Sequence, residues 1–262
     1  MPVKLHDLDT RTELLRHALG RADEARAREF QERLDMSWIY HDHALEGVVL
    51  SHQELAAGLG KAPVADASSI PVVNEIQAYK RAIDHVRELA VKKKLALTAD
   101  VIKKIYCLVA NDEAGKTAVY RKDNPLHRLY FHEIAPPEKI SYHMRKLLEW
   151  FPSEEAKRLH VIKQAAMLHF KLIGIYPYQN HSGKVARLMM NLLLLRAGYP
   201  PAIIHAIERQ RYYESLRSPQ GGLVELVNES LENSIEGALR YFTEGDPEAQ
   251  PTAEPIARKR AS

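Results

Sequence analysis

The sequence has very little cysteine, no long apolar run and no excess of charge of one sign. One cysteine in 262 residues, Cys107, excludes an internal disulfide and a cysteine-based zinc cage, so a cytoplasmic location is expected. The most apolar stretch, residues 188–195, is far shorter than the roughly 20 residues that a membrane span needs. Lys and Arg number 37 against 34 Asp and Glu, and this net charge of +3 is too small and diffuse to predict a nucleic-acid partner.

The composition is that of a folded globular protein, with 45% hydrophobic and 27% charged residues. Apolar residues recur mostly at helical spacing, so the predicted fold class is mainly α. Ser51 and Glu54 have the spacing of a capping box, which predicts a short helix after Ser51. Further helices are expected over residues 8–35, 76–94, 98–109, 136–150, 153–174, 184–197, 210–217 and 223–242. The first of these is predicted to be an exposed amphipathic accessory helix.

Residues 118–133 do not follow the helical pattern. They contain a turn-forming Asp-Asn-Pro sequence at 123–125, which predicts a small β-hairpin or extended flap. The residues on either side of this turn are apolar or aromatic: Val119, Tyr120, Leu129, Tyr130 and Phe131. An unpaired strand edge can bind a segment of another protein, so the flap is a candidate docking site for a protein partner. Residues 244–262 are rich in Pro, Ala and charge and are expected to be disordered.

A polar loop at residues 176–183 separates two apolar helices and predicts an anion site. The first turn of a helix has unpaired N–H groups and the positive end of the helix dipole, and a glycine lets a phosphate approach the backbone. Ser182, Gly183 and Lys184 open the second helix, and Arg187 lies one turn further on the same face. The alternative is that both cations are salt-bridge partners or solvated.

The run from Ala165 to Ile204 resembles the core of Fic (Fido-fold) proteins, whose signature H-P-F-x-D/E-G-N-G-R-x-x-R lies between two helices. Upstream, Asp42-His-Ala-Leu-Glu46-Gly47 is similar to the family's inhibitory motif S/T-x-x-x-E-G/N. The resemblance covers about residues 36–243 and implies a Fido-fold helical bundle. It divides the chain into an N-terminal helical extension (1–35), an inhibitory-helix segment (36–60), a Fic core (61–243) and the tail (244–262).

The resemblance implies transfer of AMP, or of another phosphate-containing group, from a nucleotide to a protein hydroxyl, but the chemical positions differ. Tyr176 stands where the family has its catalytic histidine, and a tyrosine hydroxyl is a poor general base at neutral pH. Asn180 replaces the acidic magnesium ligand and is a weaker ligand for a hard cation. No metal site is therefore predicted, and ATP or another nucleotide is the ligand that the resemblance implies. Gly183 and Arg187 match the signature, whereas Lys184 replaces its first arginine.

Two functional interpretations follow. In the first, the protein is a nucleotide-binding, anion-binding or protein-interaction scaffold without standard AMP transfer. In the second, it is a transferase with altered residues, in which His181 acts as a displaced base and Lys184 and Arg187 hold phosphates. Asp42, Glu46 and Gly47 form the inhibitory segment in either case, and Glu46 is expected to pair with Arg187. His169 lies on an apolar stripe and is predicted to be a core histidine.

Overall fold

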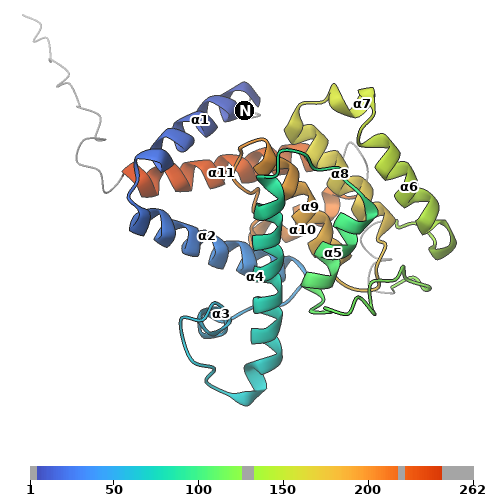
Figure 1. Ribbon diagram of the computed structural model, residues 1–262, viewed down its shortest axis with the longest axis horizontal. Coiled ribbons are helices and arrows are strands. Elements are labelled where there is room, and N and C mark those ends of the chain that lie inside the picture. The colour runs from blue at the N-terminus through green and yellow to red at the C-terminus, as the bar shows by residue number, and fades with distance from the viewer. Residues whose placement is uncertain (1–4, 126–132, 218–221, 244–262) are drawn as a thin grey trace, which may run out of the picture.

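The computed structural model describes residues 5–125, 133–217 and 222–243 (Figure 1). Over these ranges the chain is helical and contains no strand, which agrees with the predicted mainly α class. The α-helices are α1 (Leu5–Arg21), α2 (Glu24–Leu45), α3 (His52–Gly58), α4 (Ile70–Ala90), α5 (Ala99–Val109), α6 (Ile140–Trp150), α7 (Glu154–Lys157), α8 (Val161–Ile175), α9 (Ser182–Arg196), α10 (Arg209–Ser215) and α11 (Leu223–Thr243). Short 3-10 turns at Ala67–Ser69, Pro137–Lys139 and Ala206–Glu208 precede α4, α6 and α10.

Helix α9 lies at the centre of the molecule. It packs against α8 on one side and against α4 and α5 on another, and nearly all of its residues are buried. This explains why the sequence of α9 is apolar almost all round, since a helix enclosed by other helices has no solvent face. The α8–α9 pair, with its connecting loop, is therefore supported by the packing of α4 and α5 against α9.

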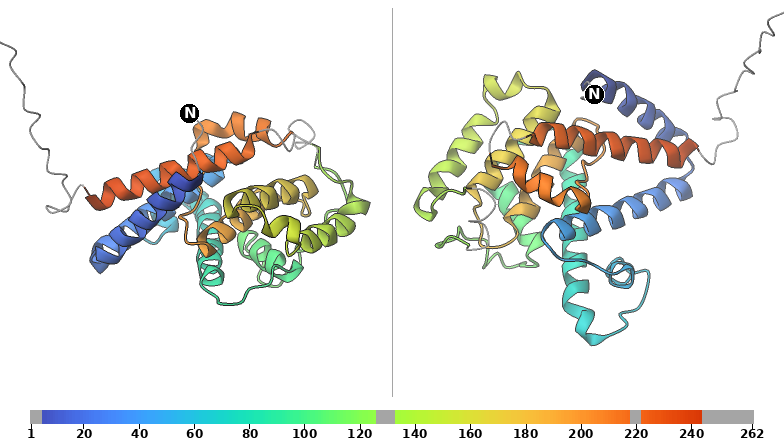
Figure 2. Two further views of the ribbon diagram at one scale, coloured as in Figure 1. Left: turned by 90° about the horizontal axis from the view of Figure 1, so that it is seen from above. Right: turned by 180° about the vertical axis from the view of Figure 1, so that it is seen from behind.

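The N-terminal region differs from the single exposed helix predicted over residues 8–35. The helix breaks after Arg21, and Asp23 caps α2 by accepting a hydrogen bond from the Arg26 N–H at 2.8 Å. Helix α1 packs along α11 (Figure 2), and its residues Leu8 and Leu15 are buried in the core. The amphipathic character is present in α1, because Leu8 and Leu15 are buried whereas Leu14 is exposed, but the prediction of a single helix was wrong and the accessory role stays a prediction.

Two other local predictions have different outcomes. The capping box is present, because Ser51 Oγ accepts from the Glu54 N–H at 3.2 Å and the Glu54 carboxylate accepts from the Ser51 N–H at 2.8 Å. The single helix predicted over residues 153–174 is instead two helices, α7 and α8. His160 starts the second one, since its Nδ1 accepts a hydrogen bond from the Ile162 N–H at 3.3 Å.

The predicted flap is described only in part. Residues 118–125 form bends and irregular backbone without a strand, and the Arg121 N–H donates to the Pro177 carbonyl at 2.9 Å. Val119 is exposed and Tyr120 is half-buried. Leu129, Tyr130 and Phe131 lie outside the described residues, as does the tail at 244–262, so the hairpin and the disordered tail stay predictions.

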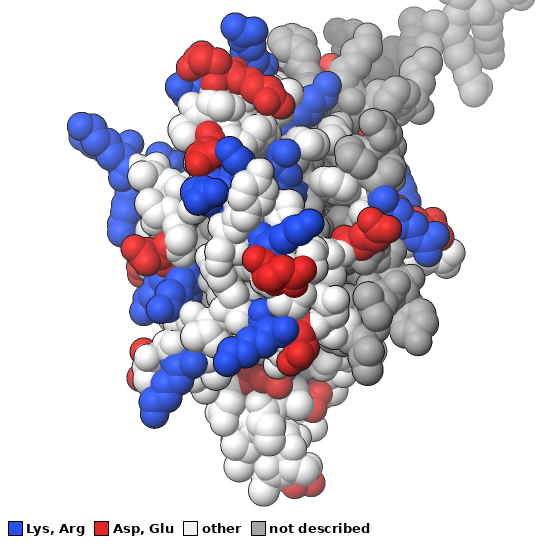
Figure 3. Space-filling view, turned by 90° about the vertical axis from the view of Figure 1, so that its right-hand side faces the viewer, with Lys and Arg blue, Asp and Glu red and all other residues white. Residues whose placement is uncertain are grey.

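In the described part of the chain, no helix is long and apolar enough to cross a membrane. Basic and acidic side chains are interspersed over the face drawn in Figure 3. Helix α6 carries the pair Lys146–Glu149 and α7 the pair Lys157–Glu154, each three residues apart. Such pairing of opposite charges leaves little net field around these two helices.

Candidate anion-binding site

Two residues in left-handed conformation delimit the loop between α8 and α9. Tyr176 (φ 48°) ends α8 and His181 (φ 60°) precedes α9, and both are non-glycine residues at positive φ. The Ser182 hydroxyl accepts from the Tyr178 N–H and donates to the Tyr178 carbonyl, both at 2.9 Å. The two backbone groups of Tyr178 satisfy the buried Ser182 hydroxyl, which closes the loop, and phosphate binding at Ser182 stays a prediction.

Arg121 holds the same loop from outside. Its buried guanidinium donates from Nε to the Tyr176 carbonyl at 2.7 Å, from Nη1 to Asn124 Oδ1 at 2.6 Å, and from Nη2 to the Ala135 carbonyl. The start of the flap segment, the α8–α9 loop and the chain leading to α6 are thus joined through one side chain. The role of Arg121 was not predicted, because no local sequence motif around this residue indicates it.

Arg187 is the centre of a buried ionic cluster. Its Nε donates to Asp42, its Nη2 to Glu46 at 2.8 Å, and its Nη1 to the Tyr212 hydroxyl at 3.1 Å. Burial disfavours the guanidinium charge, but the nearby charge of Asp42, followed by Tyr212 and Glu46, raises the pKa of Arg187 overall. The expected ion pair between Arg187 and Glu46 is therefore present, and Asp42 is a second carboxylate on the same guanidinium.

Glu46 lies against the backbone at the start of α9. A Cβ atom added to Gly183 would lie 2.3 Å from Oε1 of Glu46 and 3.2 Å from Nη1 of Arg187, so the carboxylate approaches the helix end only because residue 183 is glycine. Gly47 (φ 89°) ends α2 directly after Glu46. From α10, Arg209 Nε and the Tyr213 hydroxyl each donate to the Leu45 carbonyl at 3.0 Å. The end of α2 is thereby held over the first turn of α9.

Asp42 and Glu46 are placed differently although they share one helix face. The Asp42 side chain is 5% exposed and also accepts a hydrogen bond from the Tyr79 hydroxyl on α4, whereas the Glu46 side chain is 15% exposed. Burial, followed by the charge of Asp42, raises the pKa of Tyr79, so this hydroxyl stays protonated and donates. Asp42 is thus fixed from two sides, and Glu46 is the more accessible carboxylate.

Lys184 adds a buried cation to the site, and His43 lies nearby as a neutral side chain. The Lys184 ammonium lies 5.4 Å from the centre of the Tyr79 ring, and burial lowers its pKa. Within the described ranges, no carboxylate forms a salt bridge with Lys184. His43 is fully buried, and its Nδ1 lies 2.8 Å from the Ile39 carbonyl. Burial, followed by the charge of Lys184, lowers the pKa of His43 to about 3.

Three loop residues stand where a base or a metal ligand is expected, Tyr176, Asn180 and His181, and none of them is suited to that role. Tyr176 is 1% exposed and packs in the core, so its side chain does not face solvent as a base would. Burial, followed by the charge of Lys184, lowers the pKa of His181 to about 4, although Glu46 opposes this. Asn180 is exposed and neutral. Residues 176–183 contain no carboxylate at all, so the loop does not fit the magnesium ion that Fic chemistry implies.

His169 has the structural role that its apolar stripe predicted. It is fully buried, its Nε2 lies 3.1 Å from the Tyr212 hydroxyl, and the two rings are parallel with centroids 5.7 Å apart. Because Tyr212 also accepts from Arg187, the histidine on α8 and the arginine on α9 are linked through α10. Tyr212 is thus a positioning residue for Arg187.

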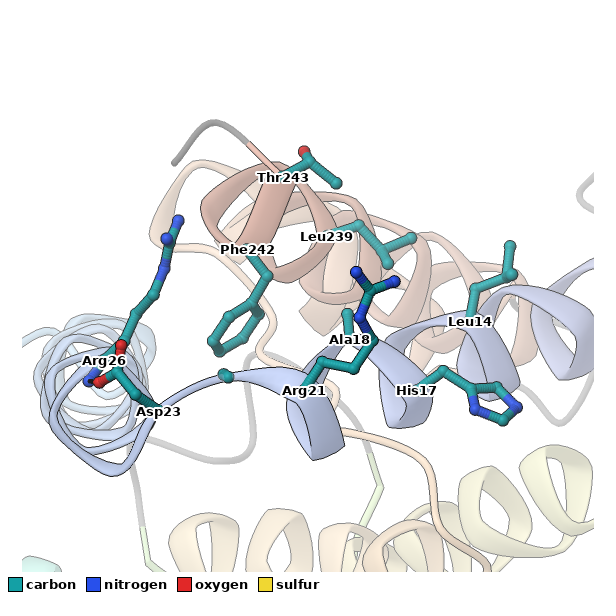
Figure 4. Close-up of a pocket in the computed structure, with 10 residues that line it drawn as sticks. Leu14, His17, Ala18, Arg21, Asp23, Arg26, Leu239, Phe242 and Thr243 are labelled. Carbon is teal, nitrogen blue, oxygen red and sulfur yellow. Dashed lines mark hydrogen bonds between the residues drawn. The ribbon is translucent and has the colours of Figure 1, made fainter. Parts of the chain in front are cut away.

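A separate cavity of about 600 Å³ lies where α1, α2 and α11 meet (Figure 4). Ala18, Leu239 and Phe242 contribute apolar surface, and Arg21 and Arg26 contribute charge. Arg26 donates to the Tyr241 carbonyl at 2.5 Å and lies over the Tyr241 ring. No residue of the α8–α9 loop lines this cavity, so it is distinct from the ionic cluster.

The surrounding architecture is also found in solved structures. A Fic domain-containing signaling protein from Bacteroides thetaiotaomicron superposes with a TM-score of 0.77 at 21% identity, covering 92% of this chain and 98% of that one. Fic-1 from C. elegans superposes with a TM-score of 0.74 at 23% identity, covering 90% of this chain and 70% of that one. At these identities the similarity establishes the Fido fold.

Sequence comparison extends the similarity beyond the fold. Residues 96–194 match the model of the Fic/DOC family. "Protein adenylyltransferase Fic" of Nematostella vectensis is 31% identical over 216 residues, which are 78% of this chain and 49% of that protein. The protein of the same name from Aedes aegypti is 32% identical over 190 residues, 70% of this chain and 37% of that protein. The chain thus spans half or less of the length of these curated relatives, and it belongs to the Fic/DOC family.

Proposed function

We propose that the protein binds the phosphate of a nucleotide, or a related anion, at the first turn of α9, that Glu46 controls access, and that standard AMP transfer does not occur. The observation that carries this proposal is the position of the Glu46 carboxylate between Gly183 and Arg187. A carboxylate there already uses the helix end and the guanidinium as an anion site. An external phosphate would need the same groups.

The physical basis is the convergence of three positive elements on one point. The first turn of α9 has unpaired N–H groups and the positive end of the dipole, Gly183 leaves its backbone accessible, and Arg187 provides N–H donors. Lys184 adds a cation without a salt bridge in the described structure. When Glu46 moves away, these groups favour another anion in its place.

The argument against standard transfer rests on base and metal together. A general base needs access to the hydroxyl that it deprotonates, and Tyr176 is buried. His181 is neutral at pH 7, but with a pKa of about 4 it is a weak proton acceptor. Asn180 supplies no charge for magnesium. All three would have to be compensated elsewhere for transfer to proceed.

Calorimetry with ATP, GTP, CTP and UTP tests the binding proposal. We expect weak binding to the unmodified protein and tighter binding to Glu46→Gly by about 1–3 kcal/mol, the scale of a charge-assisted hydrogen bond. Glu46→Gln keeps the size of the side chain and removes its charge, so it should give part of the gain. Adding Lys184→Ala to Glu46→Gly should abolish it. Equal, poor binding by all variants would contradict the proposal and leave a scaffold acting through surface contacts.

The alternative function is a Fic-type nucleotidyltransferase or other phosphate-group transferase with altered residues. The two adenylyltransferases named above support it, because they are about 30% identical to this chain. Incubation with labelled ATP and a lysate distinguishes the two: we expect no covalent label. Robust labelling that His181→Ala removes would establish the alternative and identify His181 as the base.

A protein partner is proposed for the flap side in either case. Val119 is 63% exposed at the start of this segment, and Arg121 ties the segment to the α8–α9 loop. A partner that contacts this segment would therefore also affect the position of the α8–α9 loop. A crosslinker placed at Val119→Cys should capture the partner; in a Cys107→Ala background it is the single thiol of the chain.

A further inference from the structure

We infer that the site takes a single phosphate group without a divalent cation, with a nucleoside monophosphate as the preferred ligand over a magnesium-bound triphosphate. This inference rests on the proposed function, since it specifies the ligand of the same site. It follows from the charges that remain around α9 after Glu46 has moved away, and from the composition of the loop.

Asp42 stays on Arg187 when Glu46 leaves. Asp42 receives hydrogen bonds from Arg187 Nε and from the Tyr79 hydroxyl, and α4 and α9 enclose it. Glu46, at the end of α2, accepts from Arg187 Nη2, and its side chain is more exposed than that of Asp42. Displacing Glu46 therefore uncovers Nη2 of Arg187, whereas Nε and Nη1 keep their partners.

The buried side chains of the opened site carry a small net positive charge. Lys184 and Arg187 contribute two positive charges and Asp42 contributes one negative charge, whereas Glu75, which also acts on Lys184, is exposed to solvent. The side chains thus offer one net positive charge in addition to the partial charge of the helix end. A phosphomonoester, which carries about −1.5 to −2 at neutral pH, matches this field far better than a triphosphate does.

The loop has no ligands for a metal ion that would neutralise the additional phosphates of a triphosphate. Magnesium is held in proteins by one or two carboxylates together with the phosphates of the substrate. Gln179 and Asn180 are exposed and neutral, and no residue from 176 to 183 is acidic. Additional phosphates would therefore enter without the cation that normally neutralises them.

Calorimetry on Glu46→Gly tests the inference with inorganic phosphate, AMP, ADP and ATP, each in EDTA and again with excess magnesium. We expect AMP to bind at least as tightly as ATP in EDTA, and magnesium to change the affinity for either by less than twofold. Tighter binding of AMP than of inorganic phosphate would show that the nucleoside contributes. Equal affinities for AMP and inorganic phosphate would show that the site recognises only the phosphate group, and would overturn the preference for a nucleoside monophosphate.

A tenfold or greater rise in ATP affinity with magnesium would overturn the inference and leave the proposed function intact. Absence of binding by every ligand would overturn both. Three further variants test the charge argument directly. Asn180→Asp in the Glu46→Gly background should create magnesium-dependent ATP binding, with a gain of about tenfold, whereas Gln179→Glu, its exposed neighbour, should not.

Asp42→Asn in the same background should shift the preference toward ATP in EDTA by about five- to tenfold, because it removes the fixed negative charge and keeps a hydrogen-bond acceptor for Tyr79. Thermal unfolding of each variant establishes that it is folded. An unchanged AMP-to-ATP ratio in folded Asp42→Asn would contradict the charge argument.

Discussion

The two ends of the α8–α9 loop differ in how closely they match the Fic signature. At the α9 end, Gly183 and Arg187 match the Fic signature, and the Glu46 carboxylate lies against Gly183. At the α8 end, Tyr176 is buried in the core and its carbonyl is bound by Arg121. We therefore expect anion recognition and group transfer to be separable properties of this loop, because the residues proposed for them lie at different ends.

The two ends also differ in how they are stabilised. Charged groups that neutralise one another hold the α9 end, with Arg187 between two carboxylates. Neutral acceptors hold the α8 end, since Arg121 bonds carbonyls and an amide. Breaking either end should therefore affect stability by different mechanisms and to different extents.

The largest effect is expected for Arg187→Ala. This variant leaves the buried Asp42 without its counter-charge, and removing one member of a buried ion pair typically costs about 3–5 kcal/mol. Urea unfolding measures the loss. Arg211→Ala is the matched control, because Arg211 pairs with Glu229 on the exposed surface and should cost at most about 1 kcal/mol. Similar losses in both variants would mean that the α9 cluster contributes no more than a surface pair.

A smaller loss, about 2–3 kcal/mol, is expected for Arg121→Ala at the other end. The variant removes charge-assisted hydrogen bonds to the Tyr176 and Ala135 carbonyls. Arg121→Lys should recover only part of the stability, because an ammonium cannot reproduce the guanidinium fork. Urea unfolding with hydrogen exchange at Tyr176 measures both the global and the local effect. Full recovery by lysine would show that charge alone is needed there.

A pH effect of intermediate size is expected near the α9 end. The pKa of His43 is lowered to about 3 in the folded protein, so between that value and 6.5 the unfolded state binds a proton that the folded state does not. Stability should therefore fall as the pH drops below about 6.5, with His43 contributing about 2 kcal/mol at pH 5. His43→Gln, which can still donate to the Ile39 carbonyl, should flatten the pH profile by that amount. An unchanged profile would place the pH dependence in other groups.

Local sequence signals predicted much of the fold. The capping box at Ser51, the helix beginning after Thr98 and the apolar run of α9 are all present, because each depends on neighbouring residues alone. The breaks before α2 and α8 were missed. They depend on single capping side chains, Asp23 and His160, within sequences that otherwise have continuous helical spacing.

The candidate site could be predicted only where a motif linked distant segments. The pair of Glu46 and Arg187 followed from the resemblance to the Fic inhibitory motif, although 141 residues separate the two positions. The bonds from Tyr79 to Asp42 and from Arg121 to Tyr176 span 37 and 55 residues, and no motif connects them. Such contacts arise from the packing of whole helices, so spacing within one helix does not reveal them.

The smallest effect is expected where the family's base is restored alone. Tyr176→His reintroduces the signature histidine, and a left-handed conformation is one that histidine tolerates better than most residues. AMP transfer should nevertheless stay at background, because the side chain enters a position that is 1% exposed and Asn180 still supplies no metal ligand. Labelling with ATP measures this, and Tyr176→His combined with Asn180→Asp and Glu46→Gly is the matched test. Activity in the triple variant alone would show that base, metal ligand and inhibitory carboxylate limit transfer together. Activity in Tyr176→His by itself would show that the α8 end lacks only the base. The separation of anion recognition from group transfer would then depend on one side chain.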